Sequence, residues 1–184
     1  MGYQYRFSLS EPSALYSTSV AVKINTMTDQ TTIGITACSK SKSVEPDYQG
    51  KIEAQHLYES WLFNARRDAL EANSDEWAIF SGKFGYVEPD EKLPWYDQQI
   101  AELPEEEREE LAEDVAANVG HADKILILMG RDYADKLKDA LAPDVTVWDP
   151  LEGVRLFDQR SRLKELANGD DPTGQTTFAE LKTQ

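Results

Sequence analysis

Residues 38–42 read Cys-Ser-Lys-Ser-Lys, so that one thiol, two hydroxyls and two ammonium groups fall within five positions. The apolar run 33–37 comes directly before them and is typical of a short buried strand. Backbone amides and hydroxyls just beyond a strand can hold an anion or the polar edge of a base, and lysine adds positive charge. We therefore expect Ser39, Lys40 and Lys42 to contact a ligand, with a plain solvated loop as the alternative.

Cys38 is the only cysteine of the chain. A thiol beside lysines could serve as a nucleophile or a ligand contact, because positive charge favours the reactive thiolate. The alternative, which we favour, is a structural cysteine buried at the end of a strand. A single cysteine also excludes an internal disulfide and a zinc site built from several cysteines. The segment is not a P-loop, since the glycines of GxxxxGK[ST] are missing.

A second candidate segment, residues 81–90, combines glycines with a lysine, aromatic rings and carboxylates. A further ring and a further carboxylate follow at Tyr96 and Asp97. Rings beside a carboxylate suit a planar heterocycle, which needs stacking and an in-plane hydrogen bond. The alternative is a loop whose aromatic side chains pack back over the sheet. The candidate ligand contacts of this region are Ser81, Lys83, Gly85, Tyr86 and Tyr96, and the candidate catalytic carboxylates are Asp90 and Asp97.

Arg67 is a further candidate ligand contact, because an arginine at the edge of a sheet can clamp a phosphate or a carboxylate. It lies four residues after Phe63 on the apolar side of a predicted helix, which leaves Arg66 pointing outward. The alternative for Arg67 is an ion pair with Glu59 or Glu71 on the same helix.

Gly130 and Arg131 follow the most apolar run of the chain and open another predicted helix. Gly130 leaves room at the helix N-terminus, where an anion is favoured, and Arg131 could contact that anion. The turn 149–153 is expected to be structural. His56 and His121 are far apart and have no neighbours at ligand spacing, so we expect no metal site and no cofactor.

The elements that must position these side chains alternate along the chain. Short apolar runs predict strands at 33–37, 77–80, 124–129 and 145–148, and three- and four-residue spacings predict helices over 51–72, 131–141, 155–167 and from Pro104 onward. Residues 83–100 are expected to form a long loop. This alternation predicts a three-layer α/β/α fold around a mainly parallel four-stranded sheet. In such sheets ligands bind beyond the carboxyl ends of the strands, where all the candidate segments lie.

The length of 184 residues suits one domain. We expect a single α/β domain over 31–168, preceded by a peripheral extension, 1–30, and followed by a polar tail, 169–184. Residues 1–26 are also compatible with a wrongly chosen start codon. No run approaches the roughly 18 apolar residues of a membrane span, and residues 1–20 lack a secretory pattern. The sequence therefore predicts a cytoplasmic protein without a membrane partner.

The net charge of −15, from 34 acidic and 19 basic residues, argues against generic binding to duplex DNA. A halophilic source is the interpretation that we favour for this acidity, and a basic partner is the alternative. The charge is uneven, because residues 38–67 carry five basic and four acidic side chains, whereas residues 101–123 carry one basic and nine acidic side chains. The second segment is expected to be a solvated helix face, or else a surface for a protein partner.

The segments ITACSKSK, LYESWLFNARRDA, FSGKFGYVEPDE, LMGRDYADKL and DPLEG, in this order, resemble an uncharacterised prokaryotic and phage domain family over about residues 32–167. More distantly, the chain is similar to the YaaA peroxide-stress proteins and to the uracil-DNA-glycosylase-like fold. The resemblance implies a three-layer parallel sheet in which the loop after the first strand lines the pocket. The chain departs from the family pattern where Gly82 replaces alanine and where Trp95 separates Pro94 from Tyr96. The matching positions are Cys38, Ser39, Lys42, Tyr58, Phe63, Arg67, Ser81, Lys83, Gly85, Pro89, Asp90, Tyr96, Asp97, Gly130 and Tyr133.

Three hypotheses follow from these observations. The first is a domain that handles a small nucleobase- or nucleotide-like ligand, with N-glycosidic bond cleavage or base transfer as the reaction to test. The second is a non-catalytic nucleotide-binding or sensing module with the same pocket. The third is a protein-interaction domain that uses the acidic segment 101–123.

Overall fold

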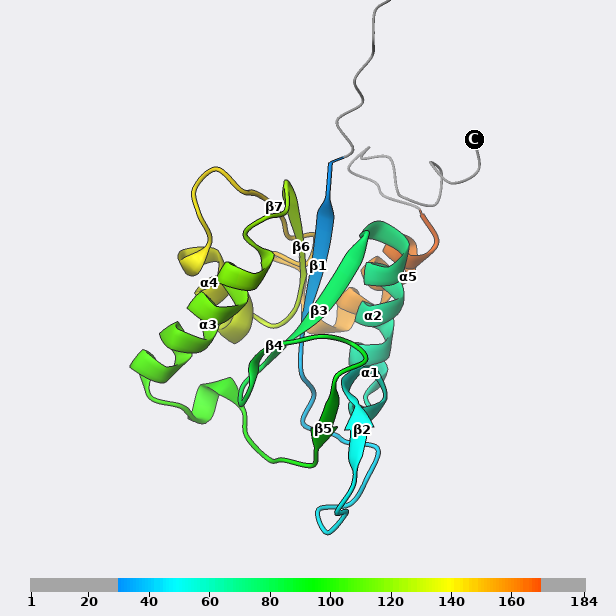
Figure 1. Ribbon diagram of the computed structural model, residues 1–184. Coiled ribbons are helices and arrows are strands. Elements are labelled where there is room, and N and C mark those ends of the chain that lie inside the picture. The colour runs from blue at the N-terminus through cyan, green and yellow to red at the C-terminus, as the bar shows by residue number, and fades with distance from the viewer. Residues whose placement is uncertain (1–29, 170–184) are drawn as a thin grey trace, which may run out of the picture.

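The computed structural model describes residues 30–169, and its centre is a five-stranded sheet of order β4-β3-β1-β6-β7 (Figure 1). Four of these strands run parallel, namely β1 (Thr32–Ala37), β3 (Glu76–Ser81), β6 (Lys124–Leu128) and β7 (Thr146–Trp148). The fifth, β4 (Gly85–Val87), pairs antiparallel with β3 at one edge. The fold is therefore α/β with a mainly parallel sheet, as predicted, but with one strand more than the sequence predicts.

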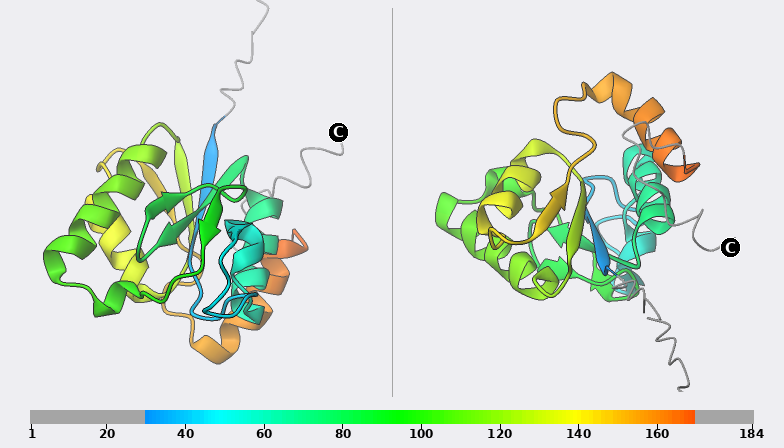
Figure 2. Two further views of the ribbon diagram at one scale, coloured as in Figure 1. Left: turned by 60° about the horizontal axis from the view of Figure 1, so that its bottom comes forward. Right: turned by 90° about the horizontal axis from the view of Figure 1, so that it is seen from above.

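Helices cover both faces of this sheet. One face carries α3 (Glu105–Val119) and α4 (Arg131–Ala140), and the other carries α2 (Trp61–Asn73) and α5 (Leu156–Ala167) (Figure 2). In β6, Ile125 and Ile127 belong to the core under α3 and α4, whereas Leu126 and Leu128 belong to the core under α2 and α5. A strand that is buried on both faces has a continuous apolar sequence, which is why this strand is predicted clearly.

Two residues of strand β1, Gly34 and Thr36, fix its position against its neighbours. A Cβ added to Gly34 would lie 2.7 Å from the Leu70 side chain and 2.7 Å from Ser74 Oγ, so the glycine lets α2 approach the sheet closely. The Thr36 hydroxyl, which is fully buried, donates to the Leu128 carbonyl oxygen at 2.9 Å. The carboxyl end of β1, where the candidate site begins, therefore has a defined position.

The predicted helix over 51–72 is wrong at its start. Residues Lys51–Glu53 form β2, which pairs antiparallel with β5 (Lys92–Pro94), and the short helix α1 (Ala54–Leu57) follows. Helix α2 begins only at Trp61, because the Ser60 hydroxyl oxygen accepts the backbone N–H of Phe63 at 3.0 Å and caps the helix there. Pairing with a distant strand and a serine cap outweigh the helical periodicity.

The predicted long loop over 83–100 is also wrong, since it contains β4, β5 and the 3-10 turn η1 (Ile100–Glu102). Gly85 makes the reversal after β3 possible, because its φ of +66° lies in the left-handed region. A Cβ at Gly85 would also collide with the Asp114 carboxylate, which accepts the Tyr86 N–H at 2.9 Å. Gly85 therefore allows a close approach to a protein side chain.

The other predicted strands and helices agree with the structure to within one residue at each end, and Pro104 is the N-cap of α3. The predicted extension 1–30 and tail 169–184 lie outside the described residues, apart from residues 30 and 169. None of the helices between residues 30 and 169 is long and apolar enough to cross a membrane.

Candidate functional site

The segment 38–42 leaves the carboxyl end of β1 and is anchored on two sides. The Cys38 N–H donates to the Phe80 carbonyl oxygen at 3.0 Å, which extends the pairing of β1 with β3. At the other end of the segment, Lys42 forms an antiparallel bridge with Tyr58. These backbone contacts fix both ends of the segment, while Lys40 and Ser41 between them are exposed, and its contact with a ligand stays a prediction.

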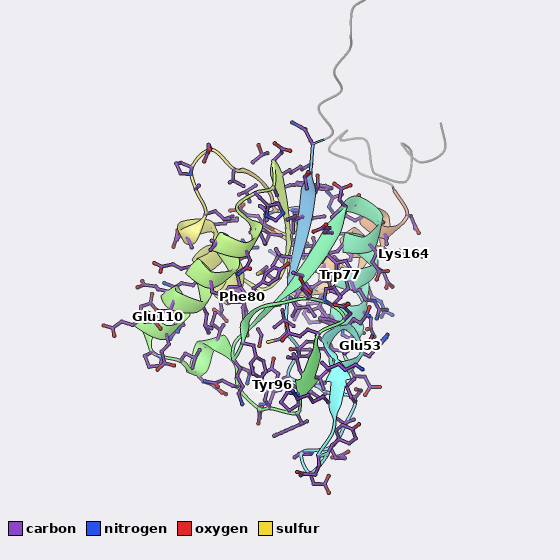
Figure 3. All side chains as sticks on the ribbon, viewed as in Figure 1. Glu53, Trp77, Phe80, Tyr96, Glu110 and Lys164 are labelled. Carbon is purple, nitrogen blue, oxygen red and sulfur yellow. The ribbon has the colours of Figure 1, made fainter. Side chains whose placement is uncertain are left out.

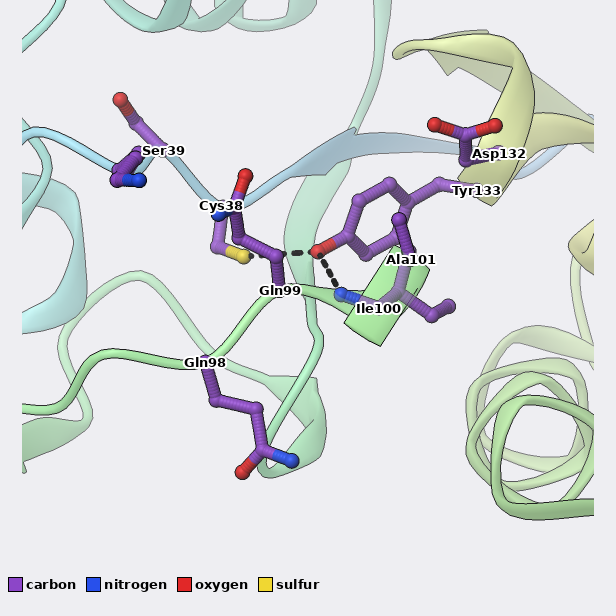
Figure 4. Close-up of a pocket in the computed structure, with 9 residues that line it drawn as sticks. Cys38, Ser39, Gln98, Gln99, Ile100, Ala101, Asp132 and Tyr133 are labelled. Atoms are coloured by element: carbon purple, nitrogen blue, oxygen red, sulfur yellow. Dashed lines mark hydrogen bonds between the residues drawn. The ribbon is translucent and has the colours of Figure 1, made fainter. Parts of the chain in front are cut away.

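A small pocket, which we term the edge pocket, opens beside this segment with a volume of about 80 Å³. The Cys38 sulfur faces the Tyr133 hydroxyl at 3.2 Å (Figure 4). The Tyr133 oxygen accepts the Ile100 N–H at 3.3 Å, which leaves its own hydrogen able to point at the sulfur. Polar side chains complete the lining, among them Ser39, Lys40, Gln98 and Asp132.

Cys38 has features of both roles that its sequence context allows. It is half-buried and packs against the apolar cluster that contains Leu57 and Ile79, as a structural cysteine would. Its sulfur also borders the edge pocket, where it faces Tyr133. The thiol is therefore held rigidly at a surface that a ligand can reach.

Three buried hydroxyls form a second group of residues, which we term the hydroxyl cluster. The Tyr96 hydroxyl lies 2.7 Å from the Tyr58 hydroxyl and 2.9 Å from the Ser81 hydroxyl. Tyr58 and Tyr96 are each 2 % exposed, and Ser81 is fully buried. Tyr96 lies with β5 below the carboxyl end of the parallel strands (Figure 3). Burial raises the pKa of Tyr58 and of Tyr96 above the usual tyrosine range, so both phenols stay protonated at neutral pH.

The hydroxyl cluster is held together by hydrogen bonds among its own members. Ser81 Oγ accepts the backbone N–H groups of Lys83 at 3.1 Å and Phe84 at 3.2 Å, so its own hydrogen is directed at the phenolic oxygens. The contact between Tyr58 and Tyr96 adds a hydrogen bond between the two phenols. The position of the Tyr96 ring is thereby fixed.

Two lysines lie over the ring of Tyr96. The Lys42 ammonium group is 4.5 Å from the centre of this ring, and the Lys83 ammonium group is 5.7 Å from it. Neither lysine forms an ion pair with a carboxylate between residues 30 and 169. Burial lowers the pKa of Lys42, while Cys38 and Asp97 act in the opposite direction. The ring and these two ammonium groups make a cationic surface, which we term the lysine pair.

The structure places the other residues of segment 81–90 differently from the sequence-based expectation. Tyr86 packs into the core under α3, whereas Tyr96 belongs to the cluster around Leu57. The ring of Tyr96 is itself buried beneath Phe84, whose ring is 5.1 Å away in an edge-on arrangement. Tyr96 therefore presents no open ring face, whereas Tyr86 is partly buried against the core under α3.

The expectation for the two arginines of α2 is reversed. Arg66 is buried, although the sequence predicts that it points outward. Arg67 forms ion pairs with Asp68 at 3.2 Å and Glu71 at 3.9 Å, which includes the helix partner considered as its alternative. The buried residues of α2 include Phe63, Arg66 and Ala69, so Arg66 follows Phe63 at three-residue spacing on the buried face and faces α5. Arg67 is thus engaged by its own helix and not by the pocket.

Arg131 is also engaged by carboxylates, at 2.7 Å from Asp149 and 3.5 Å from Asp135. Gly130 is the N-cap of α4, and a Cβ added there would meet nothing within 4 Å. The turn that begins at Asp149 is structural, as expected, because its carboxylate also holds Lys138 at 2.8 Å. The space beside Gly130 is therefore open, while the guanidinium next to it has protein partners.

The two candidate catalytic carboxylates are both exposed. Asp97 lies close enough to Lys42 to act on its pKa, which places it at the rim of the lysine pair. Asp90 lies in the turn between β4 and β5, and neither carboxylate lines the edge pocket. Of the two, Asp97 is the carboxylate that a ligand at this edge would meet.

The sequence analysis gave no role to Gln98, Gln99 or Asp132, all of which line the edge pocket. The signal that could have identified them is their position. Gln98 and Gln99 directly follow Asp97, and Asp132 directly follows Arg131. Between residues 30 and 169, no group of three His, Cys, Asp or Glu side chains is arranged to hold a metal ion. The site instead offers a thiol, hydroxyls, amides and ammonium groups.

Residues 33–165 match the model of a family of unknown function, DUF6884. This match confirms the resemblance to an uncharacterised family, while the more distant similarity to YaaA and to uracil-DNA glycosylases stays a prediction. No curated protein and no solved structure matches the chain.

Proposed function

The chain belongs to the DUF6884 family, and from the geometry of its site we propose that it binds a nucleotide-like ligand, a polar heterocycle joined to an anionic group, at the carboxyl edge of the sheet. The edge pocket takes the polar end of this ligand. The lysine pair takes the anionic end. The segment 38–42 belongs to both, since Cys38 lines the edge pocket and Lys42 belongs to the lysine pair.

The observation that carries this proposal is the lysine pair. Two ammonium groups close to one ring repel each other, and a protein with a net charge of −15 has many carboxylates that could neutralise them. The described residues nevertheless supply no ion-pair partner for Lys42 or Lys83. An anionic ligand would supply an ion-pair partner for both ammonium groups.

The size of the edge pocket fits one end of such a ligand. A typical pocket for a whole drug-sized ligand has about 300–1,000 Å³, whereas this one has about 80 Å³. Its lining offers hydrogen-bond donors and acceptors from Ser39, Gln98 and Asp132, as recognition of a base edge requires. The rest of the ligand would then extend over the lysines.

The fold supports the same proposal by analogy. We propose that the arrangement is a three-layer, glycosylase-like one, in which the loop after the first strand lines the pocket. Helices on both faces of a mainly parallel sheet, and the part that residues 38–40 play in the edge pocket, support this. Analogy of fold favours nucleobase chemistry without demonstrating it.

N-glycosidic bond cleavage or base transfer is the second candidate function. Such chemistry needs a carboxylate beside an oxocarbenium-like centre, and Asp97 at the rim of the lysine pair favours it. The expected result is that Asp97→Asn abolishes product formation from a nucleoside or nucleotide while binding remains measurable. Binding by the wild type without any product, even after long incubation, would instead identify a sensing module.

The test of the binding proposal is thermal unfolding in molar KCl with a panel of nucleobases, nucleosides, nucleotides and single-stranded oligonucleotides. A ligand at 100 times its dissociation constant should stabilise the protein by about 2.7 kcal/mol. We expect Lys42→Gln and Lys83→Gln to remove this stabilisation. The matched control is Lys51→Gln, an exposed lysine of β2 with the same change of charge, which should retain it. No stabilisation by any member of the panel would refute the proposal and direct attention to the acidic helix α3.

A further inference from the structure

Arg66 is a buried guanidinium that the described protein does not neutralise. Its side chain lies on α2, and the residue is only 8 % exposed. One terminal nitrogen donates to the Gln159 side-chain oxygen at 3.2 Å. Its Nε is buried and has no hydrogen-bond partner among residues 30–169. A charged group in this state is costly unless a further partner is present.

The charged neighbour that acts on Arg66 is another cation. Burial lowers the pKa of Arg66 to about 10, and repulsion by Arg131 contributes to the shift. No carboxylate of the described residues opposes this effect. Arg67, the next residue, has two carboxylate partners, so the helix could have supplied one for Arg66 as well. The arrangement is therefore that of a cationic site without its anion.

Two packed helices, α2 and α5, bring the polar groups of this site together, and α4 adds a nearby charge. Arg66 lies in the middle of α2, and helical side chains lean toward the N-terminus, here toward the carboxyl edge of the sheet. Gln159 lies in the first turns of α5, where its amide nitrogen donates to the Val154 carbonyl oxygen at 3.4 Å and so directs its oxygen toward Arg66. Arg131 is the first residue of α4, beside the open space at Gly130.

We propose that Arg66 and Gln159, which lie between the packed helices α2 and α5, form a binding site for a phosphate-class oxyanion, to which Arg131 adds positive charge. Arg66 is the primary ligand, because Asp149 and Asp135 already neutralise much of the charge of Arg131. The bound oxyanion accepts the Nε hydrogen of Arg66 and replaces the missing counter-charge. This site is separate from the lysine pair and does not depend on the function proposed for it.

The first test uses inorganic phosphate as the probe. Thermal unfolding of the full chain is followed while phosphate replaces chloride at constant ionic strength and pH. We expect a saturable rise in the midpoint for the wild type, and at least a tenfold weaker apparent affinity for Arg66→Met. The matched control is Arg67→Met, which removes the same charge from the next position and should retain the phosphate effect.

A second variant keeps the test decisive if Arg66→Met folds poorly. Gln159→Glu places a carboxylate where an oxygen already lies 3.2 Å from Arg66. It should raise the unfolding midpoint in chloride, because it supplies the counter-charge from within the protein, and it should remove the response to phosphate. A phosphate response that persists in Gln159→Glu and in Arg66→Met would overturn the proposal.

Two further arms separate this site from the lysine pair and identify the source of the phosphate. A response that is lost in Lys42→Gln but kept in Arg66→Met would place the anion at the lysine pair, which overturns this inference and leaves the proposed function standing. A nucleoside monophosphate serves as the second probe. If Arg66→Met weakens the stabilisation by inorganic phosphate and by the nucleotide equally, the result supports a site for free phosphate. If Arg66→Met weakens only the stabilisation by the nucleotide, the result supports a site for the phosphate group of a nucleotide. No response of the wild type to either probe overturns the inference.

Discussion

Two pairs of lysines occupy contrasting surroundings in this molecule. On α4, Lys136 pairs with Glu105 and with Glu109, at 3.9 Å from the latter, and Lys138 pairs with Asp149 at 2.8 Å and Glu152 at 3.0 Å. At the carboxyl edge, Lys42 and Lys83 lie over an aromatic ring and have no ion-pair partner among residues 30–169. The same side chain is thus held in ion pairs in one region, whereas in the other Asp97 acts on Lys42 only from beyond ion-pair distance.

This difference shows that the amino-acid composition does not explain why Lys42 and Lys83 lack an ion-pair partner among residues 30–169. Acidic residues outnumber basic ones by 34 to 19, so a lysine at an arbitrary surface position is expected to lie near a carboxylate. The α4 lysines follow that expectation. The edge lysines deviate from it at the end of a parallel sheet where ligands generally bind, and this coincidence of two independent observations favours a binding role.

The largest effect on stability is expected from removing a carboxylate that neutralises a lysine of α4. The Asp149 side chain is 3 % exposed and holds both Arg131 and Lys138. Asp149→Ala should lower the free energy of unfolding by about 2 kcal/mol, less than for a fully buried pair because both cations remain partly hydrated. Urea denaturation measures this change. Glu152→Ala, which removes an exposed partner of Lys138, should change stability by less than about 0.5 kcal/mol, and equal effects of the two variants would contradict the assignment.

A smaller effect is expected from removing the support beneath the edge lysines. Tyr96→Phe deletes the hydroxyl that accepts from Ser81 and contacts Tyr58, both of which are buried. The loss should cost about 1–2 kcal/mol in urea denaturation. Tyr48→Phe, at a residue that is 43 % exposed, is the control and should have no measurable effect.

The same tyrosines predict a pH dependence with a definite sign. Burial raises the pKa of Tyr58 and of Tyr96 above the ordinary value of 10.0. Above that pH the unfolded chain loses these protons while the folded chain keeps them, so stability should fall as the pH rises. The fall should be shallower in Tyr96→Phe, and an unchanged slope would show that these phenols do not contribute to it.

The smallest expected effect distinguishes the two lysine pairs most clearly, because the unfolding midpoint should shift in opposite directions for the two. Burial lowers the pKa of Lys42, so its charge disfavours the ligand-free folded state below that pKa, and Lys42→Met should slightly raise the unfolding midpoint. Hydrogen bonding to Glu105 raises the pKa of Lys136, so its charge favours folding until the pH rises through that pKa, and Lys136→Met should slightly lower the midpoint. Calorimetry at neutral pH without ligand compares the two. A decrease of the midpoint in both variants would show that Lys42 has a partner in the folded protein.

The parts of the fold that follow from the sequence are those specified locally. Strand β6 is predicted because each of its faces is buried, which gives an unbroken apolar run. Strands β2, β4 and β5 were missed because each has three residues and forms by antiparallel pairing with a partner strand. Helical periodicity likewise continues through Ser60, where the side-chain cap nevertheless starts a new helix.

The same distinction between locally and distantly determined features applies to the candidate site. The sequence predicts Lys42 and Lys83 as ligand contacts, since they follow strand ends, and the structure places both over the ring of Tyr96. Helical periodicity places residues three and four positions after Phe63 on nearly the same side, and the sequence does not tell which of the two faces the core, which is why Arg66 and Arg67 were interchanged. The hydrogen bond between Tyr58 and Tyr96 joins residues 38 positions apart, and no local sequence pattern predicts it.

The two edges of the central sheet have a consequence for self-association. Strand edges expose unpaired amide and carbonyl groups, and a long, flat edge can recruit a strand from another chain into an extended sheet or a fibril. Here the edge strands β4 and β7 have three residues each, and β4 runs against the direction of its neighbours. Each edge can therefore form only a few intermolecular hydrogen bonds, which disfavours templated aggregation even where salt screens the repulsion between acidic surfaces.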